Sequence, residues 1–241
     1  MLKGRKVSKR FGGVQALRAL DFDVEKKKIV GLIGPNGSGK TTLFNVITGF
    51  YVPEEGEIYF KEKNITKMKP YKISRLGIGR TFQIVRPFED LSVLENVTIG
   101  VLYGNKNINS TKEAEREAER ILEYTGINEL KDKPAGSLKL VERKRLEVAR
   151  ALATEPELLL LDEVFAGLTP TEMEKSIDLI YSLRDEMGVT LFMIEHVMKA
   201  IMNTCDKIIV IHHGEKIAEG VPEEVANNKD VIEAYLGDYH A

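Results

Sequence analysis

A glycine-rich stretch at residues 34–42, GPNGSGKTT, constrains this chain more than any other feature. It follows the apolar run IVGLI at 29–33 and leads into residues 43–47, LFNVI. This order predicts a strand, a tight loop and a helix. Glycines are needed in such a loop where the backbone wraps a bound group closely or takes a positive φ. The N–H groups of the loop and the N-terminus of the helix would then point at a bound anion.

The spacing G-x-x-x-x-G-K-T within this stretch is that of the phosphate loop of P-loop nucleotidases. We predict that Lys40 reaches the β- and γ-phosphates of a nucleotide and that the Thr41 hydroxyl binds Mg²⁺. The alternative is an ordinary glycine turn between a strand and a helix, which the Lys-Thr pair in this context disfavours. The predicted phosphate-loop residues are Gly34, Pro35, Asn36, Gly37, Ser38, Gly39, Lys40, Thr41 and Thr42.

The composition is that of an ordinary globular protein. Of 241 residues, 43% are hydrophobic and 30% charged, which suits one large α/β domain or a core with a small subdomain. The formal net charge of −2 gives no indication of nucleic acid or of an anionic membrane surface. Cys205 is the single cysteine, so no internal disulfide is expected, and the Cys and His residues show no metal-ligand spacing.

Membrane-spanning and secretion signals are not visible in the sequence. No apolar run approaches the roughly 20 residues of a transmembrane helix, and the basic start of the chain has no hydrophobic region behind it. We therefore expect a cytoplasmic protein, which could still reach a membrane by binding a membrane protein.

Residues 158–163, LLLLDE, predict a central parallel strand that ends in two acids. Four consecutive leucines suit a strand covered by helices on both faces. Open α/β sheets bind ligands at the carboxyl ends of such strands. There one acid can hold the Mg²⁺ that the phosphates share, and a second can polarise the attacking water. The alternative is a pair of acids that cap the following turn.

Other stretches predict the surrounding elements. Charges on the amphipathic helix expected at 111–125 and in the Arg143-Lys144-Arg145 triplet are interpreted as solvated faces. Residues 91–135 are interpreted as a helical insertion, and Phe11, from the residues alone, is interpreted more readily as a core residue than as one that stacks on adenine. The further predictions are strands at 20–24, 57–60, 78–83 and 189–194, helices at 69–76, 137–154, 169–187 and 222–236, and a hairpin formed by 207–212 and 216–219.

The order of these features resembles that of ABC-type ATPase subunits along essentially the whole chain. The features are the phosphate loop, Gln83 at a strand end, the arginine-rich helix, the acids of the leucine strand, and His196 at a strand end. The segments GIGRTFQ at 77–83, KIAEGVPEEV at 216–225 and VIEAYLG at 231–237 are similar to the ATPase subunits of branched-chain amino-acid importers of the LivG type. Related ATPases that serve urea, amide or lipopolysaccharide transport share much of this pattern.

The resemblance implies a fold and a domain organisation. The fold is α/β, with a P-loop NTPase core in which helices flank a mixed sheet, a small antiparallel β part and an α-helical subdomain, as in ABC ATPases. Residues 1–241 would form a single ABC ATPase domain. Residues 1–90 and 155–241 would form its core, and residues 91–154 would form the helical subdomain with the signature segment.

The resemblance also implies residue roles that spacing alone does not give. Phe11 matches the aromatic residue that stacks on adenine, which reverses the core interpretation. Gln83 matches the residue that senses Mg²⁺ and the γ-phosphate and links to the membrane partner. Asp162 matches the Mg²⁺-side acid, Glu163 the catalytic base and His196 the γ-phosphate switch. Residues 166–168 match the loop that crosses the dimer interface.

Two positions depart from the family pattern. The signature is usually Leu-Ser-Gly-Gly-Gln or a relative that keeps its second glycine, and it binds the γ-phosphate held by the opposite subunit. Here Lys139 cannot copy the neutral hydroxyl, and Val141 places a β-branched side chain where the backbone should approach closely. Val164 stands where a proline usually follows the catalytic Glu. The signature segment of this chain consists of Leu138, Lys139, Leu140, Val141 and Glu142.

The function implied is that of an ATPase subunit that powers a membrane importer, with branched-chain amino acids as the expected cargo. The cofactors would be ATP and Mg²⁺. The partners would be permease subunits at the inner face of the cell membrane, a second ABC ATPase subunit, identical or not, and indirectly a solute-binding protein; no nucleic acid is expected.

Three alternatives remain open at this stage. One is the ATPase subunit of a related urea, amide or lipid-export system, and another is a nucleotide-binding regulatory module with weak turnover. The third is a DNA-maintenance protein or translation factor, a class that usually carries coiled coils, a second ATPase domain or a basic tail; none of these is visible in this sequence, and its charge balance gives the class no support.

Overall fold

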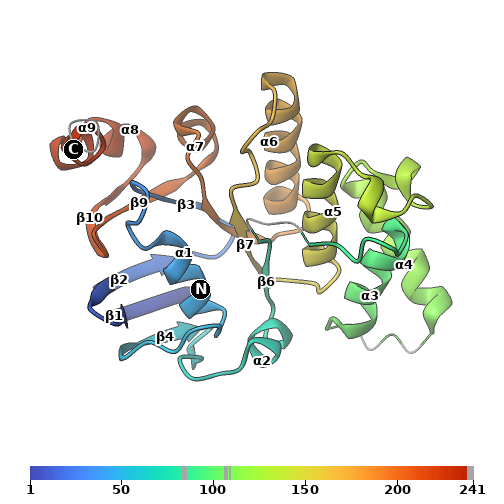
Figure 1. Ribbon diagram of the computed structural model, residues 1–241, viewed down its shortest axis with the longest axis horizontal. Helices are drawn as coiled ribbons and strands as arrows, with labels where there is room; N and C mark the ends of the chain where they lie inside the picture. The colour runs from blue at the N-terminus through green and yellow to red at the C-terminus, as the bar shows by residue number, and fades with distance from the viewer. Residues whose placement is uncertain (83–85, 106–107, 109, 238–241) are drawn as a thin grey trace.

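The computed structural model describes residues 1–82, 86–105, 108 and 110–237, which form two β-sheets and several layers of helices (Figure 1). The larger sheet has six strands in the order β10-β9-β3-β8-β7-β6, and the smaller has four in the order β2-β1-β4-β5. The larger sheet consists of β3 (Ile29–Ile33), β6 (Ile78–Arg80), β7 (Leu158–Asp162), β8 (Thr190–Ile194), β9 (Lys207–His212) and β10 (Glu215–Gly220).

The centre of the larger sheet is buried on both faces. Every residue of β3, β7 and β8 is buried, and these strands run parallel. One face packs on α1 (Lys40–Ile47) and on the smaller sheet, and the other packs on α5 (Leu140–Leu152), α6 (Pro170–Asp185) and α7 (Met198–Thr204). Because side chains alternate between the faces, a strand covered on both sides must be apolar throughout. The prediction of a doubly covered strand at the four leucines is confirmed.

The smaller sheet is antiparallel and longer than the sequence pattern indicates. Its strands are β1 (Leu2–Phe11), β2 (Val14–Val24), β4 (Glu55–Phe60) and β5 (Lys63–Asn64). Register shifts interrupt the β1–β2 pairing at three places between Gly4 and Arg10. Each shift reverses the alternation of inward and outward side chains, so the period-2 pattern that predicts a strand is visible only at 20–24.

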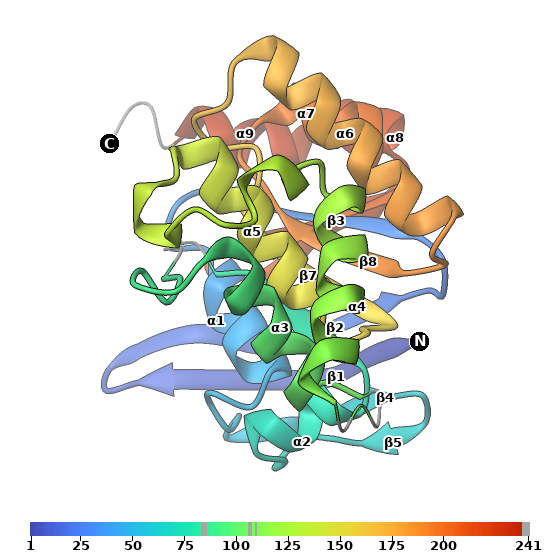
Figure 2. The same cartoon turned by 90° about the vertical axis from the view of Figure 1, so that its right-hand side faces the viewer.

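Helices α3 (Val93–Tyr103), α4 (Thr111–Tyr124) and α5 (Leu140–Leu152) surround a separate hydrophobic cluster and lie at the front of Figure 2. The predicted stripe of α4 is buried, with Ala114, Ala118 and Leu122 inside the cluster. Helix α5 has two apolar faces, because Leu146 and Ala149 belong to this cluster while the neighbouring Val148 and Leu152 pack on the large sheet. It begins three residues later than predicted, since Leu138 has an extended backbone.

The remaining helices follow local signals. Helix α6 (Pro170–Asp185) begins at the predicted capping box, where the Thr169 N–H donates to Glu172 Oε2 at 2.8 Å. The single helix predicted over 222–236 is wrong, because the chain forms α8 (Pro222–Ala226) and α9 (Lys229–Gly237). Asn228 Oδ1 accepts the Asp230 N–H at 2.9 Å and so starts a new helix.

Two short α-helices and the 3₁₀ helices η1 (Asn128–Leu130) and η2 (Ala135–Ser137) are the other helical elements of the described residues. Helix α2 (Pro70–Arg75) precedes β6, and α7 (Met198–Thr204), which the sequence pattern did not indicate, follows β8. Over the described part of the chain, none of the helices has both the length and the apolar character needed to cross a bilayer.

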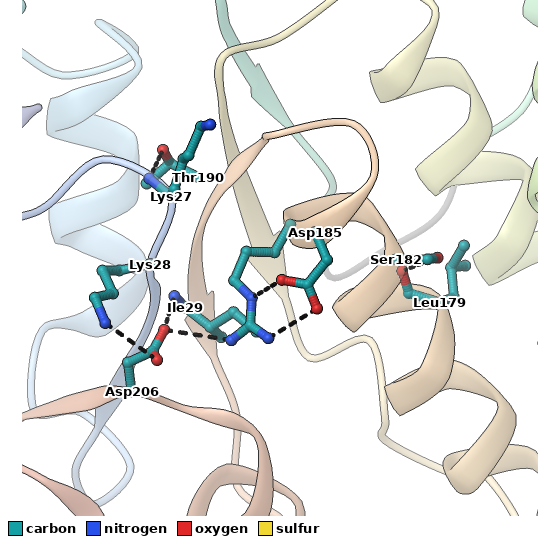
Figure 3. A network of polar contacts seen from close by, with 9 residues as sticks. Lys27, Lys28, Ile29, Leu179, Ser182, Asp185, Thr190 and Asp206 are labelled. Carbon is teal, nitrogen blue, oxygen red and sulfur yellow. Dashed lines mark hydrogen bonds and ion pairs between the residues drawn. The ribbon is translucent and has the colours of Figure 1, made fainter.

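A polar network joins the amino ends of β3, β8 and β9 (Figure 3). Asp206, just before β9, accepts the Ile29 N–H at 2.8 Å and lies 3.5 Å from Lys28 Nζ and 3.6 Å from Arg184 Nη1. The Lys27 N–H donates to Thr190 Oγ1 at 2.9 Å. These contacts align the starts of β3, β8 and β9, although the segments are far apart in the sequence.

We expect Asp206→Ala to lower the free energy of unfolding by about 1–3 kcal/mol, because the Ile29 N–H, on a residue that is 0% exposed, would lose its acceptor. The matched control is Asp185→Ala, which removes an exposed carboxylate from the same Arg184 and should cost less than about 1 kcal/mol. Urea titration of the three proteins measures both changes. Equal losses would show that the strand-end contact has no special weight.

Candidate functional site

The glycine loop lies between the carboxyl end of β3 and the first turn of α1. Two of its glycines are required by the space available. A Cβ on Gly34 would lie 2.0 Å from the Ile211 carbonyl oxygen, and one on Gly39 would lie 2.4 Å from that of Ala16. Gly39 also has a φ of +108°. The backbone therefore packs against two neighbouring segments in a way that no other residue permits.

Lys40 is buried at the start of α1, with 6% of its surface exposed. Its Nζ donates to the carbonyl oxygens of Gly34 at 2.7 Å and Pro35 at 2.8 Å, which leaves one of its three donors for another group. Burial lowers the pKa of the Lys40 ammonium, and the nearby carboxylates of Glu163 and Asp162 oppose this shift. The cation is thus held inside the loop, next to the carboxyl ends of the strands.

A cavity of about 480 Å³ opens beside this loop. Eight of the predicted site residues line it: Asn36, Gly37, Gly39, Lys40, Thr41, Thr42, Glu163 and His196. Gln15, Arg18 and His213, which the sequence did not single out, line it too. Gly34, Pro35 and Ser38 are buried behind the loop surface. The structure therefore brings residues from three distant parts of the sequence to one cavity.

Glu163 and His196 face each other because their strands are neighbours. Asp162 pairs with Ile194 across β7 and β8, so the residues that follow leave the sheet side by side. The Glu163 N–H donates to the Ile194 carbonyl at 2.9 Å, and His196 Nε2 lies 3.0 Å from Glu163 Oε1. Glu163 has a φ of +54°, an uncommon conformation for a residue other than glycine. It turns the chain sharply at the end of the strand.

Asp162 is buried behind Glu163, and 3% of its surface is exposed. Its Oδ2 lies 3.2 Å from Arg80 Nη2, while its Oδ1 is buried and accepts no hydrogen bond from the described residues. Burial raises the pKa of the Asp162 carboxyl, and the Arg80 guanidinium opposes this shift. An unpartnered buried carboxylate oxygen is a group that a cation ligand would satisfy.

Arg80 is a site residue that the sequence analysis did not single out. Besides Asp162, it contacts Asn45 Oδ1 at 2.7 Å and Thr48 Oγ1 at 3.2 Å, both on or next to α1. Burial lowers the pKa of its guanidinium, and Asp162 opposes this shift. Arg80 lies at the end of β6 beside β7. It belongs to the segment 77–83 that carries the family resemblance, and this was the signal in the sequence that could have identified it.

Gln83 lies outside the described residues, but its neighbour Phe82 is held by α5. Glu147, a buried residue of α5, accepts the Phe82 N–H, and burial raises the pKa of its carboxyl to about 7. A groove of about 410 Å³ lies next to this contact, lined by residues of α2, β6, α3 and α5. The groove exposes a set of aromatic rings, those of Phe50, Tyr71, Phe82 and Phe88.

Phe11 is not a core residue, so the interpretation from the residues alone is wrong. Its side chain is 42% exposed at the end of β1, and its ring centroid lies 5.0 Å from that of Tyr51. The turn at residues 12 and 13 carries it away from the sheet interior. Its proposed stacking on adenine stays a prediction.

The signature segment lies at the start of α5, away from the cavity beside Lys40. Leu138 is buried, Lys139 and Leu140 are exposed, and Val141 and Glu142 are half-buried. Arg143 donates to the carbonyl oxygens of Leu138 at 2.9 Å and Gly136 at 2.6 Å. The Lys139 N–H donates to Glu142 Oε2 at 2.7 Å. These bonds stabilise the turn, while Lys139 and Leu140 remain accessible.

The basic triplet 143–145 is not simply a solvated face, which corrects the interpretation of its charges. Lys144 points toward the turn after β7, where its Nζ donates to the Glu163 carbonyl at 2.8 Å.

No group of three or more His, Cys, Asp or Glu side chains with metal-site geometry occurs in the described ranges of the chain.

Comparison with known proteins gives the family. A family model for ABC transporters matches residues 17–166, and one for branched-chain amino acid ATP-binding cassette transporters matches residues 215–241. The high-affinity branched-chain amino acid transport ATP-binding protein LivG of Salmonella typhimurium is 41% identical over 241 residues, which cover 95% of this chain and 94% of that protein.

Solved structures agree with this assignment. The ADP conformation of MJ1267, an ATP-binding cassette of an ABC transporter, has a TM-score of 0.89 and 34% identity over 98% of both chains. The dimeric structure of MJ0796, a bacterial ABC transporter cassette, has a TM-score of 0.85 and 26% identity over 92% of this chain and 99% of that one. They confirm the predicted ABC ATPase fold. The chain belongs to the ABC transporter family, in the branch of ATP-binding subunits for branched-chain amino acids.

Proposed function

We propose that this chain binds and hydrolyses ATP to drive a membrane importer of branched-chain amino acids. The observation that carries the proposal is the cavity in which the buried Lys40 lies beside the Glu163–His196 pair. The relatives named above support the cargo, because their names describe branched-chain amino acid transport.

The loop and α1 would bind the nucleotide phosphates. The backbone N–H groups of 39–42 and the positive end of α1 offer donors to phosphate oxygens, and Lys40 adds a cation that already lies within the loop. Phe11 would stack on the adenine ring from the end of β1 in the smaller sheet. The P-loop residues thus position the γ-phosphate toward Glu163.

Hydrolysis would be an in-line attack of water on the γ-phosphorus. Glu163 would accept the proton of this water, and His196 would orient Glu163. His196 and Gln83 would both contact the γ-phosphate. ADP and inorganic phosphate are the products. The protein contributes position and electrostatic stabilisation rather than a covalent intermediate.

The donors present fit a bound Mg²⁺. Asp162 offers the buried Oδ1 that accepts no hydrogen bond from the described residues, and Thr41 offers a hydroxyl at the cavity. We propose that Thr41, Asp162 and Gln83 hold the ion, directly or through water. When bound, Mg²⁺ would neutralise charge on the β- and γ-phosphates.

The site would be completed by a second ABC ATPase subunit. Leu138, Lys139, Leu140, Val141 and Glu142 lie away from the chain's own cavity, so they would face the nucleotide of the opposite subunit. The dimeric structure of the cassette MJ0796 supports the presence of a second subunit. We propose that residues 1–90 and 155–241 form the core of the chain and that residues 91–154 form a helical subdomain. The core and the subdomain would move together as the dimer closes.

The groove beside Phe82 is the proposed contact with a permease. Its exposed aromatic rings offer apolar surface to a partner helix, and it adjoins the segment that leads to Gln83. The chain would therefore work at the cytoplasmic face of the cell membrane, with a solute-binding protein taking part only through the permease.

The two central roles make opposite predictions for ATP binding. Lys40→Ala should weaken ATP binding tenfold or more, because it removes a charge-assisted contact of about 1.5–3 kcal/mol. Glu163→Gln should retain affinity within about twofold but lower turnover by about 10²–10⁴-fold, because the amide cannot accept the proton. Nucleotide titration and phosphate release measure the two effects. Wild-type turnover in Glu163→Gln would remove Glu163 as the base, and unchanged affinity in Lys40→Ala would contradict the phosphate-loop assignment.

A weakly active regulatory module is the second candidate, favoured by the atypical Lys139 and Val141. If Val141 keeps the opposite nucleotide at a distance, Val141→Gly should increase ATP-dependent dimerisation and turnover severalfold, because the backbone could approach more closely. Sedimentation in the Glu163→Gln background reports the dimer, and phosphate release in the wild-type background reports the rate. No gain in either would show that Val141 does not limit the site.

Membrane copurification tests the permease contact. The tagged chain should recover membrane-spanning partner chains from solubilised membranes, and Tyr71→Glu should reduce that recovery, because it places a charge in the aromatic groove. The matched control is Tyr103→Glu, at an exposed tyrosine outside the groove. Both variants should bind ATP normally. Equal recovery with the two variants would place the partner elsewhere.

A further inference from the structure

The turn at 163–166 after β7 carries the proposed base, yet its own backbone is strained. Glu163 adopts the left-handed conformation with a φ of +54°, which costs free energy for a side-chain-bearing residue. Val164 follows it and brings no ring to fix its own φ. Such a conformation persists only where the surroundings hold it in place. Two charged residues contact this turn, one at its carbonyl groups and the other at an N–H group.

Lys144 holds the carbonyl side of the turn. Its half-buried side chain reaches from α5, and Nζ donates to the Glu163 carbonyl oxygen at 2.8 Å and to that of Ala166, and lies 3.5 Å from that of Val164. An ammonium has three donors, and three carbonyl groups surround this one. Burial lowers the pKa of the Lys144 ammonium, and the carboxylates of Glu195, Glu163 and Glu147 oppose this shift.

Glu195 holds the N–H side of the same turn. It follows the last residue of β8 and precedes His196, and 1% of its surface is exposed. Its Oε1 accepts the Phe165 N–H at 2.8 Å, and the Phe165 ring is buried in the core beneath. Glu195 therefore binds an N–H donor in the middle of the turn, and Lys144 binds the carbonyl groups at its ends.

Neither residue lines the nucleotide cavity, so neither has a direct contact there to explain its buried charge. Apolar side chains would pack against the core at lower desolvation cost. What the two charged groups supply is direction, because hydrogen bonds fix the orientation of a backbone in a way that apolar contacts do not. Both act on the peptide groups that orient Glu163.

We propose that Lys144 and Glu195 are positioning residues that hold the strained turn at 163–166 and so aim Glu163 at the attacking water. The proposal rests on the proposed role of Glu163 as base. It links the helix that begins with the signature segment to the segment that follows β8 and leads to His196, through a turn that both contact.

The test is steady-state ATP hydrolysis by Lys144→Met. Loss of the ammonium should lower kcat by about 10- to 100-fold, the effect of a small misplacement of a catalytic group. KM for ATP should stay within about twofold, because the phosphate loop is untouched. Lys144→Arg, which restores donors to the carbonyls, should recover most of kcat. The matched control is Lys175→Met, at an exposed lysine of α6, and should behave as wild type.

Glu195 provides an independent arm. Glu195→Gln keeps an acceptor for the Phe165 N–H and should retain most of kcat, whereas Glu195→Met should lose as much as Lys144→Met. If Lys144→Met does not fold, Lys144→Ala, which also leaves the carbonyl groups of the turn without a donor from this position, takes its place in the comparison. A kcat within twofold of wild type in both Lys144→Met and Glu195→Met would overturn the proposal, as would a parallel rise in KM.

A double variant separates positioning from general structural damage. In the Glu163→Gln background, Lys144→Met should lower the residual rate by less than threefold, because the group that it positions is already gone. A further loss equal to that in the wild-type background would show that Lys144 acts on something else. If Glu163→Gln itself turns over ATP normally, the proposed base fails. If Glu163→Gln is inactive and Lys144→Met is normal, only the positioning inference fails.

Discussion

Burial of the three central strands on both faces determines where chemistry can occur in this fold. Every side chain of β3 and β8, and every one of β7 up to its final Asp162, lies among apolar groups or in the sheet interior. Charged groups can therefore gather only where the strands end. Parallel strands bring these ends to one edge, which is why Lys40, Glu163 and His196 meet despite their separation in the sequence.

The charged side chains buried below this edge each have at least one partner among the described residues, although single atoms of some of them have none. Arg80 pairs with Asp162, Lys144 lies among backbone carbonyls, and Glu147 and Glu195 each accept a backbone N–H. Buried charges of this kind add little to net stability, but removing one partner is costly. They act as geometric restraints on the segments that follow β6 and β7, at Phe82 and at the turn that carries Glu163.

Features defined by neighbours in the sequence could be predicted, and features defined by distant partners could not. The phosphate loop, the leucine strand and the Thr169 cap each carry their signal within a few residues. The roles of Lys144 and Glu195 depend on a turn that comes 19 residues after one and 30 before the other. A basic triplet on a helix has the same pattern whether it faces water or carbonyl groups. Register shifts concealed the alternation of β1 and β2, although the Asn228 cap that divides the tail was visible in the sequence.

The left-handed backbone of Glu163 sets folding against activity at one position. Glycine would adopt the observed φ of +54° without the penalty that a side chain brings, a relief of about 1 kcal/mol. Selection for thermal stability alone would therefore favour glycine at this position, and the carboxylate would be lost. On the proposed role of Glu163 as base, stability therefore favours glycine at this position while turnover requires glutamate.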